Sequence, residues 1–399
     1  MAGGLTSLED AQAAVLALTR PGDPIDLPLR AARGWLAAPL IARRTQPWAD
    51  LSAMDGYALG PGTGPWRITH AVPAESRDPG SVGAAEAARI FTGAPLPAGA
   101  DRILMQEDAI VDGDSLTTTD LPPQGRSIRR KGSDFTTDAT LMPAGSPVNP
   151  ALIALAATAD HATLRCHAPA NIIIIATGSE LVAPGSGVPG LPSSNNPMLA
   201  ALVAPVASIV TDAGPVNDTI DAIGTAIARF ETENDNPALL LLTGGASVGD
   251  HDLVRPALEA EGWTIALHKI AMKPGKPLIV AHKANNRGGK HIALGLPGNP
   301  VSAFVTATLF ALPLLRHMGG CPDPLPRHDS APLAAPLPAG GTRTEYLRGR
   351  RNPDGSIEPV GAQDSAALLS LALATVLIRI DIGTPAQDIG AHARYITIG

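Results

Sequence analysis

The residues whose types and spacing could do chemistry lie in two polar loops, each directly after an apolar run. Residues 238–242, an alanine and four leucines, lead into 243–252, which holds three glycines and two aspartates. Residues 291–296 lead into 297–302, which combines glycine with asparagine and serine. Glycines let the backbone approach an anion closely, and successive N–H groups form a nest for it. These loops predict a site for a phosphorylated or otherwise anionic ligand.

Charged side chains in and near the loops refine that prediction. Lys273 and Lys276, in the segment Lys-Pro-Gly-Lys, add positive charge that favours an anion. Asp250 and Asp252 have the opposite sign, and a carboxylate does not bind phosphate directly. Carboxylates beside a phosphate site usually indicate a divalent cation that bridges the two. We therefore expect Mg²⁺ with the ligand, although Asp250 fits the cap of a helix equally well.

The elements that must position these loops are buried strands that alternate with helices. A third apolar run, 171–176, ends in Thr-Gly-Ser-Glu at 177–180, and helices are expected from 194 onward and at 221–230. Strands that are apolar throughout predict a parallel sheet with helices on both faces. Ligands of such sheets bind beyond the carboxyl ends of the strands, where the polar loops lie.

The chain as a whole is long and mildly acidic. Its 399 residues exceed one ordinary hydrophobic core, so several domains are expected. The net charge of −7 argues against nucleic-acid binding, and the two cysteines show no metal-ligand spacing. We find no signal peptide, and we expect no apolar segment to reach the ~20 residues of a membrane span. These features predict a cytoplasmic protein without nucleic-acid or membrane partners.

The first half of the chain predicts helices around a β-rich insert. A helix is expected at 5–18, where Ser7 can serve as N-cap, and further helices at 28–38 and 149–159. Residues 45–136 are short segments rich in Gly, Pro, Thr and Asp, which indicates a small β domain.

The last 79 residues return to a β pattern. Asn-Pro-Asp-Gly at 352–355 predicts a hairpin, and 368–373 and 374–380 are expected to be strands. We therefore expect a multidomain α/β plus β protein, with a doubly wound α/β centre and a small C-terminal β-barrel-like domain. The expected domains are a helical linking domain (1–43 and 137–168), the β-rich insert (44–136), the α/β domain (169–320) and the C-terminal β domain (321–399).

Seven motifs occur together and in order, at 52–58, 91–95, 128–134, 177–181, 244–252, 273–277 and 295–302. Together they resemble the MoeA family, the molybdopterin molybdenumtransferases, which are related to the E domain of gephyrin. The resemblance implies an enzyme of molybdenum cofactor synthesis that takes adenylylated molybdopterin and molybdate and releases AMP with the help of Mg²⁺. It also implies a homodimer with an active site shared between subunits, and contacts with other proteins of cofactor synthesis.

The loops and the resemblance together give candidate site residues. Catalytic roles are implied for Asp55, Thr92, Glu180, Asp252, Lys269, Lys273 and Lys276. Substrate binding is implied for Arg129, Asp134, Gly244, Gly245, Ser247, Gly249, Asp250, Pro297, Gly298, Asn299, Ser302, Arg348 and Ser365. Mg²⁺ ligation is implied for Glu180, Asp218 and Asp252.

Two departures from the family pattern and three alternatives stay open. The pair that is often Asp-Asp in the family is Asn217-Asp218 here, which removes one carboxylate, and Asp364 stands where glycine often precedes Ser365. A molybdopterin adenylyltransferase would use a similar α/β domain but would not need the two β domains. A molybdopterin-binding carrier or scaffold would need no catalytic lysines, and tungstate could replace molybdate.

Overall fold

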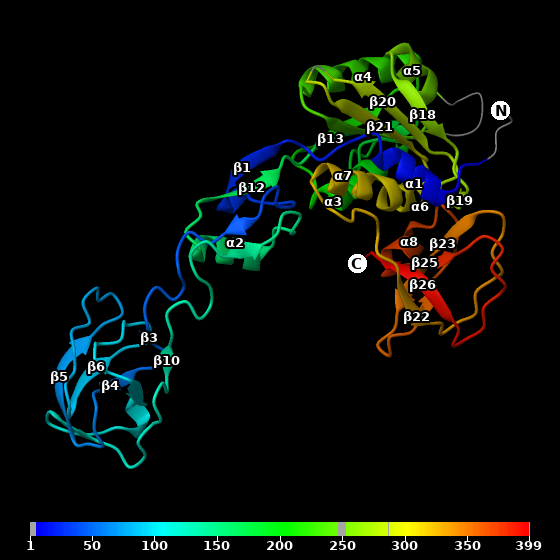
Figure 1. The fold of residues 1–399 in the computed structure, drawn as a ribbon. Coiled ribbons are helices and arrows are strands. Elements are labelled where there is room, and N and C mark those ends of the chain that lie inside the picture. The colour runs from blue at the N-terminus through cyan, green and yellow to red at the C-terminus, as the bar shows by residue number, and fades with distance from the viewer. Residues whose placement is uncertain (1–4, 246–252, 286, 399) are drawn as a thin grey trace. The chain divides into compact units, whose positions relative to one another are not determined.

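The computed structural model describes residues 5–245, 253–285 and 287–398. Its contacts divide the chain into two units, which are treated separately (Figure 1). The larger unit comprises Met1–Ile25, Arg33–Ala37 and Arg165–Gly399, and the smaller unit comprises Asp26–Ala32 and Ala38–Leu164. The finer division into four domains stays a prediction.

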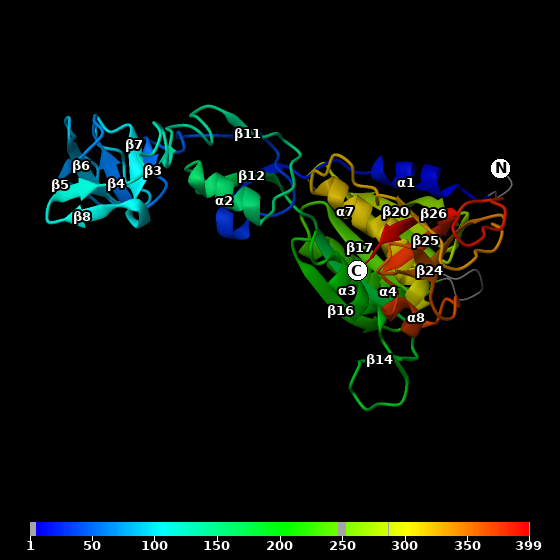
Figure 2. The same ribbon diagram turned by 90° about the horizontal axis from the view of Figure 1, so that it is seen from below.

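The smaller unit contains a six-stranded sheet in the order β7-β4-β6-β5-β9-β8. Figure 2 labels its strands β4, β5, β6, β7 and β8. Successive residues of β4, Ala58 and Leu59, are both fully buried and belong to different apolar clusters, so each face of this sheet carries its own small core. The strands are β4 (Gly56–Leu59), β5 (Trp66–Val72), β6 (Glu86–Ile90), β7 (Arg102–Met105), β8 (Ile110–Asp112) and β9 (Ser115–Thr117).

Short pairings and one helix complete the smaller unit. Strand β2 (Leu40–Ile41) pairs with β11 (Thr140–Met142), and β3 (Leu51–Ser52) pairs with β10 (Ile128–Arg129). The helix expected at 149–159 is α2 (Pro150–Thr158). Its N-cap, Asn149, accepts a hydrogen bond from the Leu152 N–H.

The prediction of a helix at 28–38 is wrong. The segment begins at the end of strand β1 (Pro24–Pro28) and forms only a single 3₁₀ turn, Leu29–Ala31. Gly34 then adopts φ +79°, a left-handed conformation that cannot continue a right-handed helix. Leu36 is buried from this extended segment and forms a bridge with Cys166 in β12 (Thr163–His167).

The central sheet of the larger unit has the strand order β16-β13-β17-β21-β20-β18. The four strands β16, β13, β17 and β21 are parallel, and the sequence predicts three of them, β13, β17 and β21. Strands β16, β18 and β20 were not predicted, and β20 runs antiparallel to both neighbours. The strands are β13 (Asn171–Thr177), β16 (Val210–Val216), β17 (Ala238–Thr243), β18 (Thr264–His268), β20 (Ile279–Ala284) and β21 (Lys290–Leu296).

Helices cover both faces of this sheet, which confirms the doubly wound prediction (Figure 1). In β13, Ile172 and Ile174 join one core while Ile173 and Ile175 join the other, so the continuous apolar run follows from burial on both faces. One face carries α1 (Leu8–Leu16), α3 (Asn195–Val203), α6 (Pro300–Thr306) and α7 (Leu312–Met318), and the other carries α4 (Ile220–Glu233) and α5 (Val254–Ala260).

Helices α6 and α7 are joined by a π-helical stretch, Ala307–Ala311, into one apolar helix. Its 19 residues, Pro300–Met318, are long and apolar enough to cross a membrane, which corrects the expectation that no segment reaches this length. However, 78% of the window is buried inside the protein, as expected for the core helix of a globular fold.

The C-terminal sheet has the order β19-β23-β25-β26-β22, and β24 adds to β23 in the predicted hairpin. The prediction of a strand at 368–373 is wrong, because this largely apolar run forms the short helix α8 (Leu368–Ala372). A short run of five apolar residues and one serine fits a buried strand or a helix equally well. The strands are β19 (Met272–Lys273), β22 (Asp329–Pro332), β23 (Thr344–Arg351), β24 (Ile357–Pro359), β25 (Val376–Ile380) and β26 (His392–Thr397).

Candidate active site

The polar loops after the parallel strands converge in the larger unit. A Cβ added to Gly298, after β21, would lie 3.5 Å from the Gly244 Cα, after β17. A Cβ on Gly245 would lie 3.6 Å from Asp218 Oδ1, after β16. The Asp218 N–H in turn donates to Ser179 Oγ, after β13, at 3.4 Å. The carboxyl ends of four strands thus form one edge. The sequence predicts this edge for β13, β17 and β21, and β16 adds a fourth strand.

Glycine is required at Gly244. Its φ is +90°, and a Cβ there would lie 2.2 Å from the Thr177 carbonyl oxygen, well inside van der Waals contact. The loops after β13 and β17 can touch only because this side chain is absent. Glycine at this position therefore lets the two loop backbones lie close together at the strand edge.

The loop after β21 continues into a second part of the site. Asn299 Nδ2 donates to Ser365 Oγ at 2.8 Å, and the Val301 N–H donates to the Ser365 carbonyl at 3.3 Å. Ser365 follows the hairpin of the C-terminal sheet. The strand-end loop and the C-terminal sheet are thus joined by direct hydrogen bonds within the larger unit.

A pocket of about 330 Å³ lies where these elements meet. It brings together five of the predicted site residues, Lys273, Lys276, Ser302, Arg348 and Ser365. Strand β19 contributes Lys273 because it pairs in parallel with β23, which carries Arg348. The remaining lining residues are Pro274, Gly275, Pro277, Arg343, Glu345, Tyr346, Leu347, Gln363 and Asp364.

Arg348 is the most unusual charge in this pocket, because it is only 1% exposed. Its Nη2 donates to the carbonyl oxygens of Ala362 and Asp364, both at 2.9 Å. Its Nε has no hydrogen-bond partner within the described residues. Burial lowers the pKa of the Arg348 guanidinium, and the nearby Asp364 carboxylate acts in the opposite direction. A buried cation held only by carbonyls is suited to receive an anion.

The other charged groups of the pocket leave it positive. Lys273 Nζ lies 3.1 Å from Glu345 Oε2, so this lysine is partly neutralised. Asp364 Oδ1 accepts the Ala366 N–H at 2.8 Å, which gives the departure from glycine a local structural role. Four cationic side chains, from Lys273, Lys276, Arg343 and Arg348, face the two carboxylates of Glu345 and Asp364.

Some predicted residues of the larger unit lie outside this pocket. Lys269 is not among its lining residues, and its φ of +76° is rare for a residue with a side chain. Glu180 is exposed in the turn after β13. Asp218 Oδ1 is buried and has no hydrogen-bond partner in the described part of the chain. Pro297 and Gly298 belong to the strand edge instead.

Four predicted residues, Ser247, Gly249, Asp250 and Asp252, lie outside the described residues. Over the ranges that the structure describes, no group of three or more His, Cys, Asp or Glu side chains could hold a metal ion.

The predicted residues of the smaller unit lie on its surface. Asp55 Oδ1 accepts hydrogen bonds from the Thr92 N–H at 2.7 Å and from Thr92 Oγ1 at 2.9 Å. Both bonds lower the pKa of the Asp55 carboxyl, and the bond from the Thr92 backbone N–H has the larger effect. Met54 and Phe91 beside them are 40% and 38% exposed. The Asp55 carboxylate and Thr92 thus join two separate loops, and exposed apolar side chains flank this contact.

Arg129 and Asp134 are both exposed and belong to the segment around β10. The neighbouring Arg130 has a structural role, because its Nη1 lies 2.6 Å from Asp50 Oδ2.

Sequence reasoning missed Arg343 and Asn195. Arg343 is one of several arginines around β23, so nothing in its spacing distinguished it. Asn195 was read only as part of a helix start, yet its Nδ2 donates to the Gly298 carbonyl at 2.8 Å. The sequence feature that could have identified Asn195 is the pair of adjacent asparagines at the start of a helix, because asparagine favours turns and caps.

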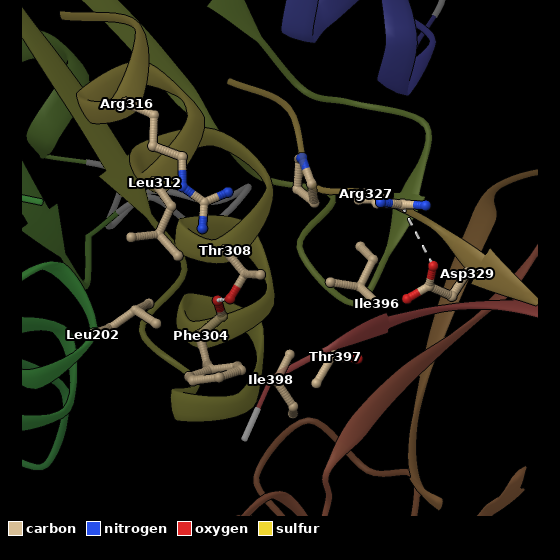
Figure 3. A pocket seen from close by; sticks show the side chains of 11 residues that line it. Leu202, Phe304, Thr308, Leu312, Arg316, Arg327, Asp329, Ile396, Thr397 and Ile398 are labelled. Carbon is tan, nitrogen blue, oxygen red and sulfur yellow. Dashed lines mark hydrogen bonds and ion pairs between the residues drawn. The ribbon is translucent and has the colours of Figure 1, made fainter. Parts of the chain in front are cut away.

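A second pocket, of about 450 Å³, contains none of the predicted residues (Figure 3). Its walls combine apolar side chains, such as Phe304 and Ile396, with the charged side chains of Arg316, Arg327 and Asp329. Arg327 at its rim lies 3.6 Å from Asp329. The smaller pocket fits anion chemistry better, because it holds the buried Arg348.

Comparisons with known proteins cover nearly the whole chain. The family model for the MoeA N-terminal region (domain I and II) matches residues 6–159, that for a probable molybdopterin binding domain matches 173–317, and that for the MoeA C-terminal region (domain IV) matches 330–395. A protein named molybdopterin molybdenumtransferase 2 from Mycobacterium tuberculosis is 33% identical over 361 residues, which is 86% of this chain and 87% of the relative. The molybdopterin molybdenumtransferase of Nostoc is 31% identical over 87% of this chain and 82% of that protein.

A crystal structure of the molybdopterin biosynthesis MoeA protein of Pyrococcus horikoshii shares the fold, with a TM-score of 0.80 and 22% identity over 99% of this chain and 100% of that one. The adenylyltransferase and carrier alternatives are not favoured, because the curated relatives are named as molybdenumtransferases and the family match includes both β-rich regions. By sequence identity over most of its length, the chain belongs to the MoeA family of molybdopterin molybdenumtransferases.

Proposed function

We propose that this protein transfers molybdenum from molybdate to adenylylated molybdopterin and releases AMP. The names of its relatives support the reaction class. The observation that carries the proposal is Arg348, a cation 1% exposed and without a carboxylate hydrogen bond in the described residues, in a pocket joined to the strand edge. Molybdate is a tetrahedral oxyanion, and such a pocket offers the positive charge that it needs.

The site divides into two parts with different chemistry. The strand edge, with Gly244, Gly245 and Gly298, offers close backbone approach and would hold the phosphates and pterin. The pocket with Arg348 and Ser365 would hold molybdate. The Asn299–Ser365 hydrogen bond at 2.8 Å joins the two parts, so both substrates can meet there.

Cleavage of the pyrophosphate bond needs charge neutralisation more than covalent catalysis. Lys276 and Lys273 would stabilise the charge that develops on the phosphate oxygens as AMP leaves. Lys269, on its strained backbone, is the third lysine proposed for this role. The attacking oxygen comes either from water or from molybdate.

Mg²⁺ is proposed as cofactor, and the residues present fit it in part. Asp218 Oδ1 is a buried carboxylate oxygen with no hydrogen-bond partner among the described residues, a costly state that a cation would relieve. Asp218 and Glu180, together with Asp252, would hold the ion. When bound, it supplies positive charge to the phosphate oxygens.

We also propose a cytoplasmic homodimer, in which the smaller unit of each subunit completes the site of the other. The contact between Asp55 and Thr92, flanked by the exposed Met54 and Phe91, offers both polar and apolar groups for this purpose. Arg129 and Asp134, also exposed, are the proposed substrate contacts of the same unit.

The test is AMP release from purified protein supplied with adenylylated molybdopterin and Mg²⁺, with and without molybdate. We expect release that depends on molybdate. Tight binding of the substrate without release would contradict the transfer reaction, and consumption of ATP with metal-free molybdopterin would indicate an adenylyltransferase. Tungstate in place of molybdate tests the choice of oxyanion.

A further inference from the structure

Gln363 lines the pocket of Lys273, Arg348 and Ser365, here called the oxyanion pocket, but has no role above. Its half-buried side chain makes three hydrogen bonds, all to the backbone. Gln363 Oε1 accepts the Arg348 N–H at 2.9 Å. Gln363 Nε2 donates to the carbonyl oxygens of Arg348 and Val360, at 3.0 and 2.9 Å. Because a carbonyl can only accept, these partners fix which way the amide is turned.

The Gln363 amide completes the pairing of two strands at the point where they separate. Strand β24 pairs with β23 in antiparallel register as far as Gly349 and Pro359. The next residues exchange only one of the two bonds of a ladder pair, from the Val360 N–H to the Arg348 carbonyl at 2.9 Å. The Arg348 N–H and the Val360 carbonyl are bonded to Gln363 instead. The amide thus fixes the Arg348 backbone to the loop that follows β24.

The two residues beside Gln363 hold the other end of Arg348. The carbonyl oxygens of Ala362 and Asp364 accept hydrogen bonds from Arg348 Nη2, both at 2.9 Å. Because these carbonyls flank Gln363 in the chain, their position depends on where its side chain is anchored. The loop therefore holds the Arg348 backbone through the Gln363 amide and the Arg348 guanidinium through its own carbonyls.

The same loop carries Ser365, two residues after Gln363. Ser365 Oγ accepts from Asn299 Nδ2 at 2.8 Å, and the Ser365 carbonyl accepts the Val301 N–H at 3.3 Å. The loop is thus anchored at its start by Val360 and at its end by Ser365, and Gln363 anchors its middle to β23. The carbonyls that orient Arg348 lie on either side of this middle anchor.

We propose that Gln363 is a positioning residue that orients the Arg348 guanidinium toward an oxyanion such as molybdate. The inference rests on the proposed function and adds the group that sets the geometry of its oxyanion pocket. Gln363 acts through Arg348 rather than on the anion itself, because both N–H groups of its amide already donate to carbonyls and leave no donor for an anion.

The test is a double-mutant cycle of Gln363→Met and Arg348→Met, with molybdate binding to the ligand-free protein measured by isothermal titration calorimetry. Methionine keeps the length of the glutamine side chain and removes its donors and its acceptor. Gln363→Met should raise the dissociation constant for molybdate roughly 10-fold, the size of one weak hydrogen bond to a charged group. In the Arg348→Met background the same change should have less than a twofold effect, because no guanidinium remains to be oriented. A merely structural role would weaken binding by the same factor in both backgrounds.

Gln12→Met is the matched control. Gln12 is a buried glutamine of α1 whose Nε2 donates to the Leu309 carbonyl at 2.9 Å, and it does not line the oxyanion pocket. Both glutamine variants lose hydrogen bonds to the backbone, so the Tm of both should fall. Only Gln363→Met should change the dissociation constant for molybdate.

Gln363→Asn is the second variant, in case Gln363→Met does not fold. It shortens the side chain by one methylene, so the amide cannot reach all three backbone partners, and molybdate binding should weaken in the same direction.

The possible outcomes separate this inference from the proposed function. The inference is overturned if the folded Gln363 variant binds molybdate within twofold of wild type, or if the loss is equal in the two backgrounds. Normal AMP release by the wild-type protein would then leave the proposed function intact. Molybdate binding that depends on Gln363, without AMP release, would refute only the transfer reaction. A wild-type protein that binds no molybdate would refute the oxyanion pocket and this inference together.

Discussion

Replacing Arg348 by methionine tests the oxyanion pocket directly. Methionine keeps an unbranched side chain of similar reach but has no charge and no donor. A hydrogen bond that involves a charged group contributes about 1.5–3 kcal/mol, and each 1.4 kcal/mol is a factor of ten. If the free Nε or a remaining guanidinium N–H binds molybdate, Arg348→Met should raise the half-saturating molybdate concentration roughly 10- to 150-fold.

The stability of the same variant should change little, because two effects oppose each other. The carbonyls of Ala362 and Asp364 lose their donor, which costs about 1–3 kcal/mol for each group left without water. Removing a guanidinium that is only 1% exposed relieves an unfavourable burial. We expect the free energy of unfolding, measured with urea, to fall by no more than about 2 kcal/mol.

The assay is AMP release at varied molybdate and at saturating adenylylated molybdopterin. Arg350→Met is the matched control, since Arg350 lies on the same strand but is exposed and paired with Glu358 at 2.6 Å. It should leave the molybdate dependence unchanged. A half-saturating molybdate concentration within threefold of wild type in Arg348→Met would refute the pocket. An equal rise in the requirement for the pterin substrate would show a general loss of structure instead.

Three further changes test other parts of the molecule. Asp55→Asn removes the charge but keeps an oxygen that can accept both hydrogen bonds from Thr92. AMP release should therefore fall without a change in Tm. Full activity of this variant would contradict a role for the charge. Lys283→Met removes the cation that donates to both carboxylate oxygens of Glu231, at 2.8 and 2.6 Å. The free energy of unfolding in urea should fall by about 1–2 kcal/mol. Changing Glu231 to glutamine in the same variant should restore this free energy. Burial lowers the pKa of His291 in the folded protein, so its stabilising effect is complete above the unfolded pKa of about 6.5 and is lost as pH falls toward the folded value. Urea midpoints should therefore fall between pH 7 and pH 5, and a fall of the same size in His291→Gln would refute this assignment.

The family and the central architecture could be predicted from local patterns in the sequence. The runs at 172–176 in β13 and 238–242 in β17 are apolar at every position, which only a strand buried on both faces requires. Glycine-rich loops at their ends marked the edge where ligands bind. Ser7 was predicted as the cap of the first helix, and its Oγ accepts the Asp10 N–H at 3.1 Å. These features depend on neighbours in the chain, so the sequence by itself determines them.

Tertiary structure decided what short apolar runs and scattered charges become. The run at 368–373 forms helix α8 rather than a strand, and 28–38 is mostly extended, because such segments take the conformation that their packing allows. The oxyanion pocket forms only because Lys273 pairs opposite Glu345 across β19 and β23, residues 72 apart in the chain. Arg348 reads in the sequence as one arginine among several, and it becomes a buried cation only when the C-terminal sheet encloses it. Long-range pairing leaves no local period in the sequence, which is the physical reason why the fold and the strand edge could be predicted while the pocket required the structure.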